Sequence, residues 1–141
     1  MRRFEGNPIL QPLKDHFWES RMVFNAAAVY QDNRVHIIYR AIGVDGISRL
    51  GYASSSDGYN IQERLPDPVF EPANENERDG CEDPRLIPLG GSYVMTYTAV
   101  RSLVQCKFQI GMTSISMDDF LNKRWNWDER WLPFKGVRDK D

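Results

Sequence analysis

Several residue types that mark particular classes of protein are scarce in this 141-residue sequence. It has only two cysteines, Cys81 and Cys106, and two histidines, His16 and His36. Neither cysteine lies in a Cys-x-x-Cys pair or near a histidine, so we expect two free thiols and no structural metal. Because His36 lies within an apparent strand and has no candidate partner, we expect its ring to face solvent.

Long apolar runs and an excess of positive charge are also missing. No stretch approaches the roughly 18 apolar residues that span a membrane, and residues 1–10 lack the apolar core of a signal peptide. The formal net charge is −2, and lysine and arginine are scattered along the chain. The sequence therefore offers no basic stripe for nucleic acid or an anionic membrane, and it predicts a cytoplasmic protein that binds neither.

Apolar residues that alternate with polar ones are abundant. Residues 34–42, 48–55, 92–100 and 104–114 are rich in β-branched and aromatic side chains, which predicts strands. Residues 31–34 (QDNR) and 89–92 (LGGS) are typical of hairpin turns. Only residues 116–125 suit a helix, a short one with Ser116 as its N-cap. The pattern predicts an all-β fold.

The chain repeats itself at an offset of 58 residues. Asn25 then coincides with Asp83 and Tyr39 with Tyr97, and residues 51–56 match residues 111–116 after two more positions are inserted. Units of about 40 to 60 residues with three or four strands are typical of propeller blades. Residues 1–141 are therefore expected to form the amino-terminal part of a single β-propeller domain, with about two blades and the start of a third.

Two blades cannot close a ring, since propellers have about four blades or more. The two open sheet faces would then expose apolar area and strand edges. We expect such a chain to associate with further copies of itself, as a homo-oligomer.

Glu82 and Asp83 are the strongest candidates for chemistry. They lie in GCEDPRL, residues 80–86, at the start of an apolar strand. One interpretation is a solvated turn stiffened by Pro84. The other follows from the repeat, which places Asp83 and Asn25 at the beginning of two innermost strands, facing one cavity. A carboxylate there could serve as a general acid if burial raises its pKa.

Three arginines could line the same cavity. Arg85 lies two residues after Asp83 and either holds a substrate oxygen or pairs with Glu82 at the surface. Arg40 and Arg101 each follow an apolar strand, where arginine is commonly just exposed, although two at one rim would bind an anion. The four tryptophans could stack on sugar rings, but inter-sheet packing is the usual role; they are Trp18, Trp125, Trp127 and Trp131.

A set of short segments resembles the amino-terminal half of glycoside hydrolase family 130. The matching segments are NPIL (7–10), VFNAAAVY (23–30), IIYRAIGVDGISRLGYASSSDG (37–58), PVFEP (68–72), GCEDPRL (80–86) and YTA (97–99). The resemblance implies a five-bladed β-propeller, here incomplete, whose third blade begins at residues 136–141. It also implies an inverting phosphorylase acting on β-mannosides of the β-1,4-mannooligosaccharide or mannosylglucose type.

The same resemblance implies roles for individual residues. Asp83 would be the proton donor, and Asn25, Arg40 and Arg85 would help to hold the mannose, with Arg101 and Glu82 as further substrate-binding candidates. Inorganic phosphate would be the co-substrate and attack the anomeric carbon to give mannose 1-phosphate, with no cofactor and no metal. Two alternatives stay open: a glycosidase that hydrolyses β-mannosides on the same architecture, and a non-catalytic, self-associating propeller fragment.

Overall fold

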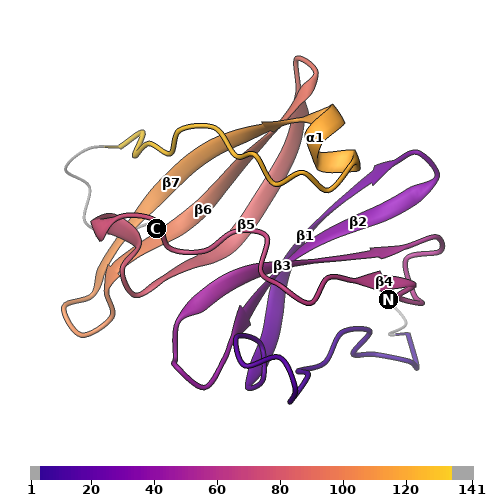
Figure 1. Cartoon of the computed structure of the whole chain (residues 1–141), viewed down its shortest axis with the longest axis horizontal. Coiled ribbons are helices and arrows are strands. Elements are labelled where there is room, and N and C mark those ends of the chain that lie inside the picture. The colour runs from indigo at the N-terminus through magenta and orange to yellow at the C-terminus, as the bar shows by residue number, and fades with distance from the viewer. Residues whose placement is uncertain (1–3, 135–141) are drawn as a thin grey trace.

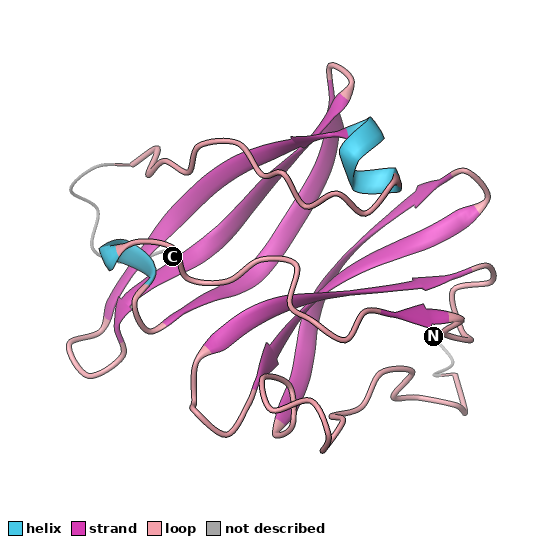
Figure 2. Cartoon of the chain, viewed as in Figure 1, coloured by secondary structure: helices cyan, strands magenta, loops and turns pink. Residues whose placement is uncertain are grey.

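The computed structural model describes residues 4–134, and these form an all-β structure (Figures 1 and 2). The first half of the chain contains the strands β1 (Met22–Gln31), β2 (Arg34–Ile42), β3 (Ser48–Ser55) and β4 (Glu63–Arg64). A 3₁₀ turn, η1 (Glu75–Glu77), leads into β5 (Gly80–Leu89), β6 (Ser92–Ser102) and β7 (Lys107–Ser116). The single α-helix of this region, α1 (Met117–Leu121), follows directly.

The seven strands are hydrogen-bonded in the order β1-β2-β3-β5-β6-β7, with β4 paired to β3. Every pairing is antiparallel except that of β3 with β5, which consists of the single pair Ser48–Gly80. The sheet therefore has two antiparallel halves, which we call the first unit (β1–β4) and the second unit (β5–β7). Figure 1 shows them as two separate fans of strands.

The hairpin turns of both units have the predicted residues and geometry. Asp32 and Asn33 join β1 to β2 with φ angles of 50° and 57°, and Gly90 and Gly91 join β5 to β6 with φ angles of 58° and 83°. Two successive positive φ angles match the right-handed twist of the flanking strands. The predicted cap of α1 is also confirmed, because the Ser116 side chain accepts a hydrogen bond from the Asp119 N–H at 3.0 Å.

The repeat is confirmed in three dimensions by a buried glutamate–tyrosine pair in each unit. The Tyr39 hydroxyl donates to Glu19, and the Tyr97 hydroxyl donates to Glu77. The two glutamates are again 58 residues apart and are at most 1% exposed. Burial raises the pKa of both tyrosine hydroxyls, and the adjacent carboxylates add to the effect. Each tyrosine hydroxyl therefore stays a neutral donor at ordinary pH.

A glycine lies against each of these tyrosine rings. A Cβ atom on Gly51 would come within 2.4 Å of Tyr39 Cζ, and one on Gly111 within 2.4 Å of Tyr97 Cζ. Any larger residue would push the ring off its carboxylate. The glycine that begins each repeated segment, 51–56 and 111–116, is therefore needed to leave room for the tyrosine ring.

Two apolar clusters hold the structure together. The larger one brings together Ile38 and Tyr52 of the first unit with Met95 and Ile115 of the second, and Phe120 of α1 packs into it. The smaller cluster lies in the first unit alone and includes Trp18, Ile37, Tyr39, Ala41 and Ala53. Within residues 4–134, no helix is long and apolar enough to cross a membrane.

Two local predictions were wrong. The strand expected at 104–114 begins only at Lys107, because residues 103–106 form a turn in which the Cys106 N–H donates to the Leu103 carbonyl. His36 does not face solvent: it is 5% exposed, and its Nδ1 lies 2.8 Å from the Tyr52 hydroxyl. Alternation alone could not reveal this, since the ring is covered by Phe120 of α1, whose ring centroid lies 5.6 Å away.

Burial lowers the pKa of His36 below its usual value of 6.5, although the nearby Gln31 carbonyl partly opposes the shift. The unfolded chain therefore binds a proton that the folded chain resists, and stability falls as the pH drops below about 6.5. We expect the free energy of unfolding to decrease between about pH 7.5 and pH 5.5, by up to about 1.4 kcal/mol per pH unit from this residue.

Urea unfolding at both pH values measures this effect, and His36→Gln is the matched variant because glutamine does not titrate. The variant is expected to show a smaller loss on acidification than the wild-type protein. Equal losses in the two proteins would show that His36 does not carry the pH dependence.

Candidate active site

Asn25 and Asp83 occupy equivalent irregularities in β1 and β5. The β1–β2 pairing shifts register between Phe24 and Ala27, and the β5–β6 pairing shifts between Glu82 and Arg85. Asn25 has a φ angle of 45° and Asp83 one of 50°, a left-handed conformation that asparagine and aspartate tolerate best among non-glycine residues. Bulges of this kind re-aim side chains.

The re-aimed side chains meet although 58 residues separate them. The Asn25 Nδ2 donates to Asp83 Oδ1 at 2.8 Å, and the Arg40 Nη1 donates to the same oxygen at 3.0 Å. Arg40 lies on β2, so β1, β2 and β5 each supply one group. The Asp83 side chain is 19% exposed and that of Arg40 is 14% exposed. The carboxylate is therefore fixed by two donors while still reachable from solvent.

Glu82 lies deeper and fixes the arginine. Its side chain is 8% exposed and forms an ion pair with Nη2 of Arg40. Ser48 completes a closed set of contacts: its hydroxyl donates to Glu82 Oε1 at 3.0 Å and accepts from Arg40 Nε at 3.1 Å. The Arg40 guanidinium also lies 4.5 Å from the ring centroid of Phe24. Glu82, Ser48 and Phe24 thus fix the Arg40 guanidinium, and its Nη1 is directed toward Asp83.

Ser48 was missed by the sequence analysis. It occupies the single β3–β5 pair opposite Gly80, and a Cβ atom on Gly80 would approach the Ser48 Cβ to 2.8 Å. Gly80 has a φ angle of 149°. A glycine within a strand often marks a place where another backbone approaches closely. Gly80, directly before Cys81, was therefore the signal in the sequence that could have pointed to a neighbouring strand here.

The structure places the other two arginines differently. Arg85 is exposed, and its Nη1 donates to the Pro84 carbonyl at 2.8 Å and weakly to the Asp83 carbonyl at 3.5 Å. Arg101 is exposed near the end of β6, next to Val100, which pairs with Gly80. Arg101 lies one position beyond that pair, so at about 3.3 Å per residue four residues put it roughly 13 Å along the strands from the Asp83 bulge.

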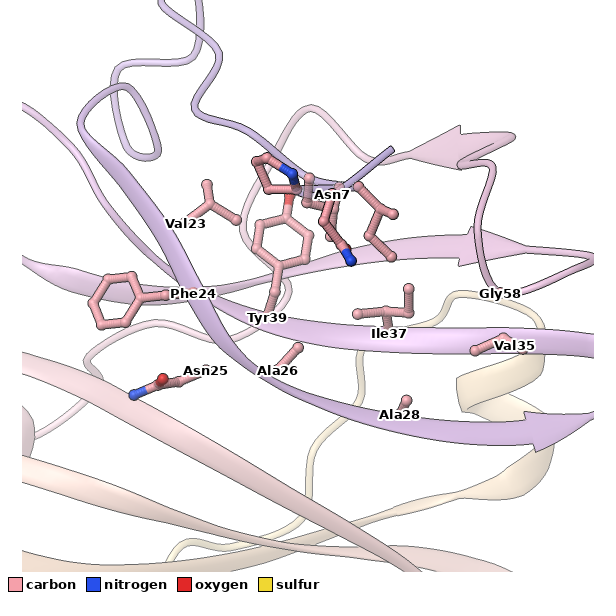
Figure 3. A pocket seen from close by; sticks show the side chains of 13 residues that line it. Asn7, Val23, Phe24, Asn25, Ala26, Ala28, Val35, Ile37, Tyr39 and Gly58 are labelled. Carbon is pink, nitrogen blue, oxygen red and sulfur yellow. The ribbon is translucent and has the colours of Figure 1, made fainter. Parts of the chain in front are cut away.

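An apolar pocket of about 380 Å³ lies beside this cluster, between β1, β2 and residues 7–10. Its lining includes Val23, Ile37 and Tyr39 (Figure 3). In Figure 3 the Asn25 amide points away from these apolar side chains. Asn25 therefore separates an apolar hollow from the charged cluster around Asp83.

The charged cluster suits acid–base chemistry on a neutral, polyhydroxylated substrate. It combines one reachable carboxylate with an amide and a guanidinium, which are the groups that donate to hydroxyl and ether oxygens. The residues from 4 to 134 include no group of three or more histidine, cysteine, aspartate or glutamate side chains placed to hold a metal ion.

Comparison with known proteins identifies the family. The family model described as β-1,4-mannooligosaccharide phosphorylase matches residues 1–117. The chain belongs to glycoside hydrolase family 130. This confirms the resemblance that was based on segments such as GCEDPRL and VFNAAAVY.

Two curated relatives come from Thermoanaerobacter sp. (strain X514). A 1,2-β-oligomannan phosphorylase is 38% identical over 137 residues, covering 92% of this chain and 46% of the relative. A β-1,2-mannobiose phosphorylase is 36% identical over 135 residues, covering 86% of this chain and 44% of the relative. The chain thus spans about half the length of the curated relatives it matches.

A solved structure of the family superposes with a TM-score of 0.81 at 30% identity, covering 96% of this chain and 42% of that one. It comes from work on family members that are glycoside hydrolases targeting β-1,2 mannosidic linkages in Candida mannan. A glycosyl hydrolase from Bacteroides ovatus gives a TM-score of 0.76, also at 30% identity, covering 90% of this chain and 39% of that one. The family therefore includes both phosphorylases and hydrolases.

Proposed function

We propose that this protein cleaves β-mannosides by inverting phosphorolysis and releases mannose 1-phosphate. The observation that carries the proposal is the Asp83 carboxylate held by Asn25 and Arg40, three groups that only the folded chain brings together. The two phosphorylases from Thermoanaerobacter support it.

In the proposed reaction Asp83, in its protonated form, gives its proton to the oxygen of the leaving sugar as the glycosidic bond breaks. A phosphate oxygen attacks the anomeric carbon from the opposite face, so the new carbon–oxygen bond has inverted configuration. Asn25 and Arg40 hold the mannose, with Arg85 and Arg101 as further candidates, whereas Glu82, first predicted to bind the substrate, contacts Arg40 instead. Since phosphate is already a nucleophile, the step needs no general base and no cofactor.

Glu82 acts on the substrate indirectly in this scheme. Its carboxylate is bonded to Arg40 and Ser48, so it fixes the guanidinium rather than reaching the sugar. A buried carboxylate with two donors is also poorly suited to activate water.

Hydrolysis is the second candidate, because the solved structure with a TM-score of 0.81 comes from work on hydrolases of this family. An inverting hydrolase needs a second carboxylate about 6.5–9.5 Å from the first, with room for water between them. Incubation with β-1,2-mannobiose, with and without phosphate, separates the two. The proposal expects mannose 1-phosphate only when phosphate is present; free mannose formed equally in both would establish hydrolysis.

The linkage is the next testable point. The resemblance to glycoside hydrolase family 130 implied β-1,4-mannooligosaccharides or mannosylglucose, whereas both curated relatives are named for β-1,2-linked substrates. We propose β-1,2-mannosides. The protein is expected to show a kcat/KM for β-1,2-mannobiose at least about tenfold above that for β-1,4-mannobiose. This ratio corresponds to about 1.4 kcal/mol of discrimination between the two transition states. The reverse ratio would assign the β-1,4 linkage.

We also propose that the two units are the first two blades of a five-bladed propeller. The shared bulges, the two glutamate–tyrosine pairs and the superposition on solved members of the family support this. The predicted start of a third blade at residues 136–141 lies outside the described residues. Self-association and a cytoplasmic location stay predictions.

A further inference from the structure

The contacts that hold Asp83 in place favour its ionised form. The Arg40 guanidinium lies 3.0 Å from Asp83 Oδ1, and a cation at this distance stabilises the carboxylate. Asn25 donates to the same oxygen at 2.8 Å and acts in the same direction. A general acid must carry its proton before the bond breaks. Asp83 therefore needs a compensating negative charge nearby to serve in that role.

Glu82 supplies a negative charge at the same guanidinium. Arg40 Nη2 pairs with Glu82 and Arg40 Nη1 pairs with Asp83, so two carboxylates share one cation. Like charges this close together favour the protonation of one of them. The Glu82 side chain is 8% exposed and that of Arg40 is 14% exposed, so water screens these charges weakly.

Arg40 is tied more closely to Glu82 than to Asp83. The guanidinium bonds to Glu82 directly, and it also donates through Nε to Ser48 Oγ at 3.1 Å. The Ser48 hydroxyl, in a residue that is 1% exposed, donates to Glu82 Oε1 at 3.0 Å. Arg40 thus reaches Glu82 by two routes and Asp83 through Nη1. Asp83 is therefore the carboxylate that can take up the proton.

The other strands packed against this point contribute uncharged groups. From β1, β3 and β6 these are Asn25, Ser48 and Thr98, the last of which pairs with Glu82 across the sheet. Arg85 is a further charged side chain on β5, but its Nη1 donates to backbone carbonyls, with the Pro84 oxygen at 2.8 Å. Within residues 4–134, the charge balance at Asp83 therefore depends chiefly on Arg40 and Glu82.

We propose that Glu82 balances the charge of Arg40 and thereby keeps Asp83 able to carry the proton for the leaving sugar. Ser48 is the positioning residue that links Glu82 to Arg40. The use of this proton in bond cleavage rests on the proposed function, whereas the protonation of Asp83 can be measured without any substrate. The proposal requires a negative charge at position 82, beyond a hydrogen-bond acceptor.

Glu82→Gln separates the charge from the hydrogen bonds. The contacts with Arg40 and Ser48 both go to Oε1, so the glutamine oxygen can keep both while the charge is lost. In the ¹⁵N-labelled protein, the side-chain amide signal of Asn25 reports the protonation of Asp83. We expect the pH midpoint of this signal to lie at least about one pH unit lower in Glu82→Gln than in the wild-type protein.

Two variants assign the signal and provide the neutral control. The Asn25 signal is identified by its loss in Asn25→Ala, and its titration is expected to disappear in Asp83→Asn. Ser48→Ala removes a neutral group next to Glu82 and keeps the charge, so its midpoint should stay within about 0.3 pH unit of the wild-type value. A fall in Ser48→Ala as large as in Glu82→Gln would overturn the charge-balancing role.

The same comparison can be made without the cation. Arg40→Met keeps Glu82 as an unbalanced negative charge, and the double variant Arg40→Met/Glu82→Gln has neither charge. The double variant is expected to titrate at least about one pH unit below Arg40→Met. Equal midpoints with and without the charge at position 82, in either background, would overturn the proposal.

Activity measurements distinguish this inference from the proposed function. With β-1,2-mannobiose and phosphate, the fall of kcat/KM at alkaline pH is expected to move to lower pH in Glu82→Gln, by the same amount as the signal of Asn25. A lowered midpoint in a protein whose wild type shows no phosphorolysis would contradict the proposed function alone. Phosphorolysis by the wild type with an unchanged midpoint in Glu82→Gln would contradict this inference alone.

Discussion

Asp83→Asn is expected to lower kcat for phosphorolysis of β-1,2-mannobiose by about 10²–10⁴-fold, because an amide cannot supply the proton that the leaving sugar oxygen needs. The substitution keeps the size of the side chain and an oxygen that accepts from Asn25 and Arg40. Binding of the disaccharide should therefore change much less than kcat, and release of mannose 1-phosphate measures both parameters.

A substrate whose leaving group needs no proton provides the control for this variant. Fluoride leaves without protonation, so cleavage of β-mannosyl fluoride is expected to be nearly equal in the wild-type and Asp83→Asn proteins. An equal loss with both substrates would mean that Asp83 has a structural or binding role instead. Full activity of the variant with mannobiose would remove Asp83 from the mechanism.

Arg64→Met is expected to produce the largest loss of stability, about 3–5 kcal/mol in the free energy of unfolding. The Arg64 guanidinium, 13% exposed, pairs with the fully buried carboxylate of Glu19 and donates to the Tyr39 hydroxyl at 3.1 Å. Methionine keeps an apolar stem of similar length but removes the guanidinium, so the buried carboxylate keeps only the Tyr39 hydroxyl and His16 Nδ1, 2.6 Å away, as partners. Urea unfolding at neutral pH measures the difference.

Two further variants locate the cause of that loss. The double variant Glu19→Gln/Arg64→Met removes the buried charge as well, so it should recover part of the lost stability. Arg124→Met is the surface control, because Arg124 pairs with Asp118 and Asp119 where water screens the charges, and it should change stability far less. A double variant no more stable than Arg64→Met would show that packing, rather than the uncompensated carboxylate, carries the effect.

Much of the local structure could be predicted from the sequence, and the reason is that it depends on near neighbours. The bounds of β2 and β3 follow the alternation of residues 34–42 and 48–55, and the turns follow from asparagine and glycine at positions that need positive φ. The 58-residue repeat placed Asn25 and Asp83 at equivalent positions, and both lie at bulges.

Other features could not be predicted because they depend on groups distant in the chain. The burial of His36 arises from packing of Phe120 of α1 against its ring. The roles of Ser48 and Glu19 arise from partners that are 34 and 45 residues away. Neither hydropathy nor spacing encodes such contacts, which exist only after the two units pack together.

The sequence by itself determined an all-β chain, two repeated units and the family, since periodicity, turn residues and the GCEDPRL segment are local properties. Only the tertiary structure decided that Asn25 and Arg40 bind the same oxygen of Asp83, and that Arg85 turns to backbone carbonyls. The physical reason is that the whole fold sets the direction of a side chain at a bulge. It also sets how the two units, joined by the single pair Ser48–Gly80, pack together.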